Sequence, residues 1–317
     1  DSAVAARFDG EGNYLSGSIL RHVEVSYAET GVGCASRAPY LAKAVLSSNR
    51  VGIGTSANAS IRIDTCTFSQ NSKGADLIDS ASVMDSVFRE NGEAGLWVWD
   101  HGTGDVRVSR SSFLDNGIGA VLHGSIGITF TGNLLAHNRG SWMLEGTSGV
   151  QIGDPVAREM RSVLVANNTV IANAGNGVRI DYGASESVTI AGNNLVGNNE
   201  CDLSIGGADV AIGANYWGDI PSYQIASRIC DCNDTEEGCG DSSLVGQVTR
   251  WGDLSGPDQA APAFAQTVSV TPDTVGIETA TVEIEFSRPM QPAPIPQVTV
   301  HDARRGSEEH LLGAEYP

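Results

Sequence analysis

Outward-pointing tryptophans are the first residues in this chain that could bind a ligand. In the run 95–101, strand alternation would turn Leu96 and Val98 inward and Trp97 and Trp99 outward. Equivalent runs at 119–123, 141–145 and 177–181 would complete two outer columns, which are Trp97, Val121, Trp142 and Arg179 in one and Trp99, His123, Leu144 and Asp181 in the other. Exposed aromatic rings can stack on sugar rings, while polar groups bind hydroxyls. The candidate carbohydrate-binding residues are therefore Trp97, Trp99, Trp142, His123 and Arg179. The alternative is that this patch packs under a loop, another domain or another subunit.

Acidic side chains in the same runs raise the alternative of catalysis. Glycoside hydrolases use two carboxylates that face one cleft about 5 to 10 Å apart. Asp100, Glu145 and Asp181 would lie on neighbouring runs at such a spacing. His123 and Arg179 would lie close by as proton-transfer or charge-stabilising groups. Scattered outward acids more commonly form a solvated face, so we favour a non-enzymatic role and keep a polysaccharide lyase or glycoside hydrolase as the alternative.

A carboxylate-rich stretch further along the chain suits calcium, which prefers a shell of several oxygen ligands. The candidate ligands around its glycine turn are Asp231, Asn233, Asp234 and Asp241. Their spacing differs from that of an EF-hand loop. The alternative is an acidic turn held in place by Cys232 and Cys239.

The cysteines form an even set, made up of Cys34, Cys66, Cys201, Cys230, Cys232 and Cys239. In a β-rich chain from an oxidising compartment such a set favours structural disulfides, and we expect at least two, with the pairing left open. A zinc site built from Cys230, Cys232 and Cys239 is the alternative. It lacks a C-x-x-C pair and a neighbouring histidine.

A repeat between Ile61 and Gly218 must position all these side chains. Each unit has an apolar-x-apolar run, a polar residue, a large apolar residue and, in all but the last unit, an asparagine. The large apolar residues are Phe68, Phe88, Phe113, Leu135, Val170, Leu195 and Trp217. A constant pattern at variable intervals is typical of a solenoid whose insertions fall in loops. The longest interval predicts such a projecting loop at 149–160.

Two columns of polar residues should run along this solenoid. One contains Asn133, Asn168, Asn193 and Asn215, and the other contains Asn71, Asn91, Asn116, Asn138, Asn173 and Asn198. Stacked coils lie about 4.8 Å apart, so amides at equivalent positions can hydrogen-bond from one coil to the next. Asparagine also suits the left-handed conformation that tight turns require.

The repeat resembles the right-handed parallel β-helix family, which includes pectate-lyase-like proteins and the carbohydrate-binding and sugar-hydrolase repeats. The resemblance covers roughly residues 17–246 and implies an all-β, right-handed parallel β-helix. It leaves function open, because this fold hosts lyases, hydrolases and non-enzymatic surface proteins. The N-T-D, D-D and G-H-G motifs of polygalacturonase-like hydrolases are absent from the sequence, as is the lyase motif around the base.

Further resemblances divide the chain into domains. The N-x-W-G segment at 215–218 resembles the end of bacterial β-helix proteins, and it predicts a capping helix over 221–229. Residues 247–264 are typical of a linker. Phe286–Met290 resembles the F-S-x-P-M signature of bacterial Ig-like domains and predicts a partial Ig-like sandwich over 265–317. The β-helix would then occupy 1–246, with residues 1–15 covering its open end or with further coils before Asp1.

Charge and composition narrow the function. The net charge is -19 with only two lysines, Lys43 and Lys73, which argues against nucleic acid and anionic membranes as partners. No apolar run is long enough for a membrane span. We therefore expect a secreted or cell-surface protein of structural or adhesive role that contacts a polysaccharide or another surface protein, with self-assembly as a further option.

Overall fold

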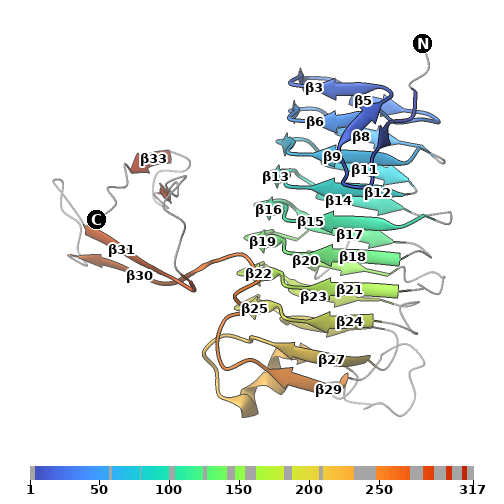
Figure 1. Cartoon of the computed structure of the whole chain (residues 1–317). Helices are drawn as coiled ribbons and strands as arrows, with labels where there is room; N and C mark the ends of the chain where they lie inside the picture. The colour runs from blue at the N-terminus through green and yellow to red at the C-terminus, as the bar shows by residue number, and fades with distance from the viewer. Residues whose placement is uncertain are drawn as a thin grey trace. The chain divides into compact units, whose positions relative to one another are not determined.

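The structure is a computed structural model, and it describes residues 4–56, 59–78, 80–99, 104–123, 127–140, 147–153, 162–181, 188–206, 210–231, 248–271, 281–288, 298–301 and 309–312. The chain divides into two compact units, Asp1–Pro262 and Ala263–Pro317. The first unit is an all-β solenoid of stacked coils (Figure 1). This confirms the predicted fold class for the repeat.

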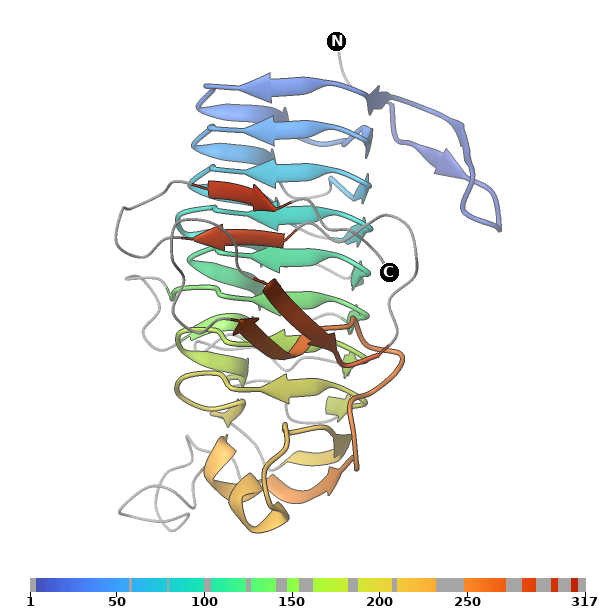
Figure 2. The same cartoon turned by 90° about the vertical axis from the view of Figure 1, so that its left-hand side faces the viewer.

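Three parallel sheets run along the solenoid, and each coil contributes one strand to each sheet (Figures 1 and 2). The first sheet contains β3 (Ile19–Arg21), β6 (Tyr40–Ala42), β9 (Ile61–Asp64), β12 (Ala81–Met84), β15 (Val106–Ser109), β18 (Gly127–Thr131), β21 (Ser162–Ala166) and β24 (Val188–Ala191). The second contains β4 (Glu24–Ser26), β7 (Val45–Ser47), β10 (Thr67–Ser69), β13 (Val87–Arg89), β16 (Ser112–Leu114), β19 (Leu134–Ala136), β22 (Thr169–Ile171) and β25 (Asn194–Val196). The third contains β5 (Thr30–Cys34), β8 (Val51–Thr55), β11 (Lys73–Ile78), β14 (Ala94–Trp99), β17 (Ile118–His123), β20 (Thr147–Ile152), β23 (Asn176–Ile180), β26 (Leu203–Ile205) and β28 (Ile229–Cys230).

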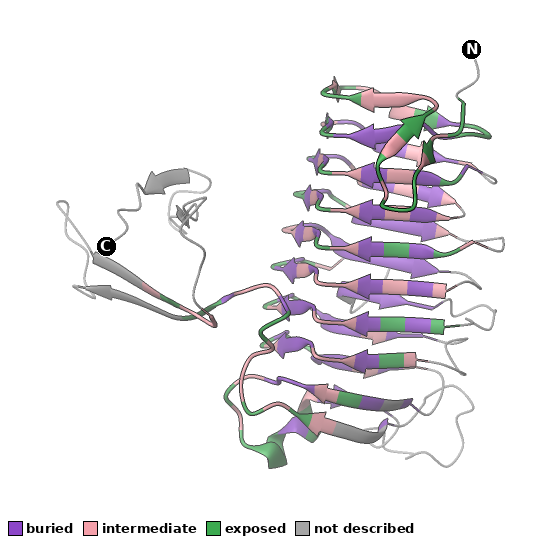
Figure 3. Cartoon of the chain, in the orientation of Figure 1, coloured by how far each residue is buried: buried purple, intermediate pink, exposed green. Residues whose placement is uncertain are grey.

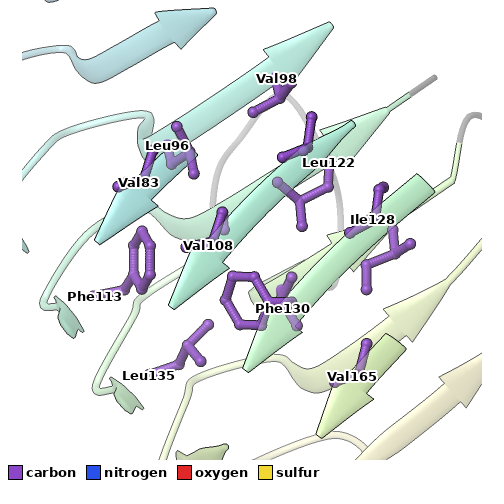
Figure 4. Close-up of a cluster of buried hydrophobic side chains, with 14 of the residues drawn as sticks. Val83, Leu96, Val98, Val108, Phe113, Leu122, Ile128, Phe130, Leu135 and Val165 are labelled. Carbon is purple, nitrogen blue, oxygen red and sulfur yellow. The ribbon is translucent and has the colours of Figure 1, made fainter. Parts of the chain in front are cut away.

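Strand alternation fills the interior with apolar columns, because identical positions stack from coil to coil. Figure 3 shows buried residues recurring on the strands of successive coils. Phe68, Phe88 and Phe113 pair in register on β10, β13 and β16, and their rings stack 4.7 and 4.9 Å apart. Leu96 and Val98 of the third sheet meet this core from the opposite side (Figure 4). The predicted inward positions are therefore confirmed.

The shorter asparagine column forms a continuous ladder of hydrogen bonds. The Nδ2 group of Asn133 donates to Oδ1 of Asn168 at 3.1 Å, and Asn168 donates in the same way to Asn193 at 3.0 Å. The backbone N–H of each ladder residue donates to the same oxygen. Cys66 occupies an equivalent place, where its Sγ accepts the N–H of Ala44 at 3.5 Å. The predicted ladder is confirmed, and a thiol is one of its members.

The longer column forms a second ladder that begins at Asn49 and ends at a carboxylate. Asn49 and Asn71 each donate to the amide oxygen of the next asparagine, and the series continues to Asn198. Asn198 then donates its Nδ2 and its backbone N–H to Oδ1 of Asp202, at 2.7 and 3.0 Å. The final acceptor needs no donor of its own, so a carboxylate can close the series.

The left-handed turn residue is the one that precedes each ladder position except Asn215, where Ala214 has no positive φ. Thr65, Asn167 and Ala172 have φ values of 55°, 55° and 53°, and they come directly before Cys66, Asn168 and Asn173. The expectation that the ladder asparagines themselves adopt this conformation was wrong. The turn residue faces solvent and needs only a positive φ, whereas the next residue must point its amide along the stack.

We expect Asn168→Ala to lower the free energy of unfolding by roughly 1 to 3 kcal/mol, because the substitution leaves buried groups without partners. Asn168 also donates to the Phe130 carbonyl at 2.9 Å, and this acceptor would lose its donor. Chemical denaturation measures the change. Asn199→Ala is the matched control, since Asn199 is exposed and lies just outside the ladder. Equal stability of Asn168→Ala and the parent would contradict the role of the ladder.

The described cysteines form one disulfide, between Cys201 and Cys230. Cys34 and Cys66 are buried free thiols. The expectation of at least two disulfides stays a prediction, since only one pair falls within the described residues. The thiol of Cys66 is used in the ladder. Cys232 and Cys239 lie outside the described residues. Because Cys230 is disulfide-bonded, the zinc site that required it is excluded in this state.

The two free thiols should react slowly with iodoacetamide in the native protein. Burial raises the pKa of both Cys34 and Cys66, which lowers the fraction of reactive thiolate. After denaturation without reductant, peptide mapping should show both alkylated and the peptides of Cys201 and Cys230 still joined. Rapid labelling of native Cys66, or its recovery in a disulfide-linked peptide, would contradict this assignment.

The C-terminal end of the solenoid is closed by a short 3-10 helix, η1 (Ser222–Arg228), within the predicted capping segment. Its Ile225 is buried against the core. Strand β27 (Val210–Asn215) pairs in parallel with β29 (Val248–Asp253), so the segment predicted as a linker contains a strand of the solenoid. The indole of Trp217 donates to the Gly252 carbonyl at 3.2 Å, which fixes this extra strand in place.

A hairpin of β1 (Arg7–Phe8) and β2 (Tyr14–Ser16) lies against the outer side of the first sheet. The rings of Phe8 and Tyr14 contact Tyr40 of β6, at centroid distances of 5.2 and 5.8 Å. The Arg62 guanidinium lies 4.3 Å from the Phe8 ring and donates to the Gly12 carbonyl at 2.9 Å. Residues of the predicted cap therefore contact the flank of the solenoid.

The second unit contains two antiparallel strand pairs among its described residues. β30 (Ala265–Thr271) pairs with β31 (Thr281–Phe286), and β32 (Val298–His301) pairs with β33 (Glu309–Leu312). Antiparallel pairs are the building blocks of a sandwich. The Ig-like assignment of this unit stays a prediction.

Candidate carbohydrate-binding face

The outer side of the third sheet carries the predicted columns of side chains. Trp97 pairs in register with Val121, Val121 with Gln151, and Gln151 with Arg179. Trp99 pairs with His123 in the neighbouring column. The predicted outward direction of both tryptophans is confirmed, since Leu96 and Val98 between them belong to the core. We call this surface the aromatic face, defined by Trp97, Trp99, His123, Gln151, Arg179 and Asp181.

Strand β20 corrects the register in the middle of the face. Residues 147–152 form the strand of this coil, whereas 141–145 was predicted to do so and 149–160 was predicted to be a loop. Gln151 consequently occupies the position assigned to Trp142, which lies outside the described residues. Both stretches begin with small residues and alternate in polarity, so strand periodicity alone did not distinguish them.

Trp97 and Trp99 form a stacked aromatic pair with unequal exposure. Their ring centroids lie 5.7 Å apart at an angle of 18°, and His123 meets the Trp99 ring edge-on at 4.9 Å. Trp97 is only 6% exposed, because it packs with Ala94, Ile118 and Val121 in a cluster separate from the core. Trp99 is the more accessible ring, so it is the surface on which a ligand could stack.

A buried polar group lies on the same side of the sheet, two to three strands from the aromatic pair. Arg179 donates from Nε to Oδ1 of Asp181 at 2.8 Å, and Gln151 donates from Nε2 to the other oxygen. Asp181 and Gln151 are 3% and 2% exposed although both are on the outer side of the sheet. Their mutual contacts hold the Arg179 guanidinium in a defined orientation.

Two buried polar atoms on this face have no hydrogen-bond partner, and they are Nε1 of Trp97 and Oε1 of Gln151. Such atoms are uncommon, since an unsatisfied buried group costs about 1 to 3 kcal/mol. One is a donor and the other an acceptor, two strands apart in one column. A ligand that carries both kinds of group could satisfy them.

Comparison with known protein families agrees with the geometry. A family profile described as a right-handed β-helix region matches residues 49–217. The chain belongs to this right-handed β-helix family. No match was found among curated proteins or among solved structures. The match begins at Asn49, the first residue of the longer ladder, and ends just after Asn215, the last residue of the shorter one. It therefore supports the fold of the β-helix protein and leaves its ligand open.

The β-helix fold and the Cys201–Cys230 disulfide are compatible with an extracellular protein. Among the residues that the structure describes, no helix has the length and apolar character needed to cross a membrane.

The predicted catalytic carboxylates of the β-helix protein are not brought together in its described part. Asp100 and Glu145 lie outside the described residues. Asp181 is described, and both of its oxygens already accept hydrogen bonds. Asp76 pairs in register with Trp97 and is separated from Asp181 by four strand spacings, or roughly 19 Å. These two acids are too far apart to act as a glycosidase pair.

The predicted calcium ligands fall mostly beyond the described parts of the β-helix protein. Asn233, Asp234 and Asp241 lie outside the described residues. Asp231 is described, and its Oδ2 accepts the backbone N–H of Val248 at 2.8 Å. Within the described ranges, no group of three or more histidine, cysteine or acidic residues could hold a metal ion.

A cavity of about 530 Å³ lies elsewhere on the β-helix, between the N-terminal hairpin and the first sheet. Its polar lining includes Arg62, Ser82 and Arg107. Arg62 pairs with Asp64 at 3.0 Å, and Arg107 approaches Asp105 at 3.4 Å. The ion pairs leave Nε of Arg62 buried without a hydrogen-bond partner, among hydroxyls and apolar walls. The cavity is separate from the aromatic face.

Sequence reasoning missed Gln151, Lys73 and Asp76 as members of the β-helix protein's outer columns. The Lys73 ammonium lies 4.3 Å from the Trp97 ring centroid and pairs with Asp76 at 3.0 Å. One available signal was the G-x-x-x-x run at 74–78, which has the same spacing as 95–99. Aligning these glycines would have placed Asp76 beside Trp97.

Proposed function

We propose that this β-helix protein has a structural or adhesive role at the cell surface or outside the cell, and that it contacts carbohydrate through the aromatic face. The observation that carries the proposal is the Trp97–Trp99 stack, which points away from the core beside His123. An accessible ring flanked by fixed polar groups is the usual composition of a sugar-binding surface. The Arg179–Asp181 pair supplies polar contacts at the other end.

A polysaccharide lyase or glycoside hydrolase remains the second function, with Asp181 as its acid or base. The hydrogen bonds from Arg179 and Gln151 favour a positioning role for this carboxylate over proton transfer. The proposal also includes calcium near Asp231 and an Ig-like identity for the second unit. It further includes contact with another surface protein and self-assembly.

A glycan-retention experiment tests the proposal. Affinity electrophoresis through gels that contain single polysaccharides would compare the parent with Trp99→Ala. Loss of stacking should weaken retention about tenfold, which corresponds to 1.4 kcal/mol. Tyr223→Ala is the aromatic control, because Tyr223 is 80% exposed and lies on η1. Retention of no polysaccharide by the parent would overturn the proposal, and release of reducing ends by the parent but not by Asp181→Asn would establish the enzyme instead.

A further inference from the structure

We infer that the aromatic face selects an uncharged, hydroxyl-rich glycan and rejects acidic polysaccharides. This inference rests on the proposed function and adds the chemical class of the ligand. It is carried by the pairing of charges on the face and by its two unpartnered buried atoms.

The ammonium of Lys73, which contacts Trp97 of this face, and the guanidinium of Arg179 already have carboxylate partners. The Lys73 ammonium pairs with Asp76 at 3.0 Å, and the Arg179 guanidinium pairs with Asp181 at 2.8 Å. The Asp181 side chain is 3% exposed, so a ligand carboxylate that took over Arg179 would leave it buried without its counter-charge. A ligand carboxylate would therefore have to share the Arg179 charge with Asp181, which weakens its attraction to the face.

The wider charge of the chain acts in the same direction. The net charge is -19. The segments 100–103, 141–146, 154–161 and 182–187, which flank strands of the third sheet in the sequence, contain the acids Asp100, Glu145, Asp154, Glu159 and Glu186 against Arg158 and Arg161. A polyanion approaching such a chain is repelled.

The unpartnered atoms specify what the ligand must provide. Nε1 of Trp97 can only donate, and Oε1 of Gln151 can only accept. They are two strand spacings apart along the helix axis, or roughly 10 Å. A hydroxyl group can serve either atom because it donates and accepts, whereas a carboxylate cannot donate to Gln151. A polyhydroxylated chain lying along the axis fits both requirements.

Affinity electrophoresis with two sets of polymers tests the inference. Dextran, xylan and a mixed-linkage β-glucan are the uncharged probes, and polygalacturonate and alginate are the acidic probes. We expect retention by at least one uncharged polymer, with little change between low and high salt, since no charge is involved. Retention by the acidic polymers alone, abolished by salt, would overturn the inference and leave the proposed function standing. Retention by neither set would overturn the proposed function itself.

Two conservative variants test the named contacts. Trp97→Phe keeps an aromatic ring and removes the donor, while Gln151→Met keeps the approximate volume and removes the acceptor. Each should weaken retention by the uncharged polymer about fivefold to tenfold in the folded protein. The thermal midpoint of Trp97→Phe should stay close to the parent, whereas Gln151→Met should lower it because the buried Asp181 also loses a donor. A merely structural role would leave retention unchanged in the folded protein, whatever the thermal midpoint. Unchanged retention in both variants would overturn the assigned contacts, and Tyr223→Phe serves as the matched control.

Discussion

Replacing Arg228 with alanine should lower the free energy of unfolding by about 3 to 5 kcal/mol, the usual cost of leaving a buried charge without its partner. Arg228 donates from Nε to Oδ2 of Asp202 at 2.8 Å, and this bond raises the pKa of the guanidinium. The Asp202 side chain is 1% exposed, so water cannot replace the lost donor. Urea denaturation at neutral pH measures the change.

A double variant separates the charge from the shape of this contact. Asp202→Asn keeps an oxygen for Asn198 and removes the charge, so Arg228→Ala combined with Asp202→Asn should recover most of the stability lost in the single variant. Arg110→Ala is the exposed control, because its ion pair with Asp85 is on the surface and contributes about 1 kcal/mol or less. Equal losses for Arg228→Ala and Arg110→Ala would contradict the buried pair.

Truncating Trp97 to alanine should lower the free energy of unfolding by about 3 kcal/mol, although the side chain points away from the core. The ring is 6% exposed and packs with Ala94, Ile118 and Val121. Its removal also abolishes the cation–π contact with the Lys73 ammonium. Thermal and chemical denaturation should both show the loss.

Trp99→Ala is the natural comparison for this substitution. Trp99 is on the same strand and the same side of the sheet, and it is partly exposed. We therefore expect Trp99→Ala to lower the free energy of unfolding by about 1 kcal/mol. Trp97→Phe should restore most of the stability of Trp97→Ala. Identical denaturation midpoints for Trp97→Ala and the parent would show that the outer cluster does not stabilise the sheet.

The repeat predicted the solenoid because its constraints recur in every coil. Phe68, Phe88 and Phe113 share one position in the pattern, and stacking them fixes the register of all three sheets. The asparagine ladders followed from two constant offsets. Even the direction of Trp97 followed from alternation, since its neighbours Leu96 and Val98 had to face the core.

The burial of outward-facing side chains and the contacts that depart from the repeat could not be predicted in the same way. Trp97 is outward but buried, because burial depends on what covers a side chain and alternation predicts only its direction. The insertion before β20 hid Gln151, since two stretches of that coil have strand character. Arg228 lies outside the repeat, and its contact with Asp202 joins residues that no periodicity relates.

The asparagine ladder that ends at Asp202 gives the solenoid a direction and a defined end. Each internal coil accepts hydrogen bonds from the coil before it and donates to the coil after it, so internal coils are interchangeable in this respect. A duplicated coil with the same asparagine could be inserted between Asn71 and Asn173 without creating an unmatched donor. Beyond Asn198, Asp202 accepts and has no amide to pass on. Evolution can therefore add coils within the ladder more easily than after Asp202.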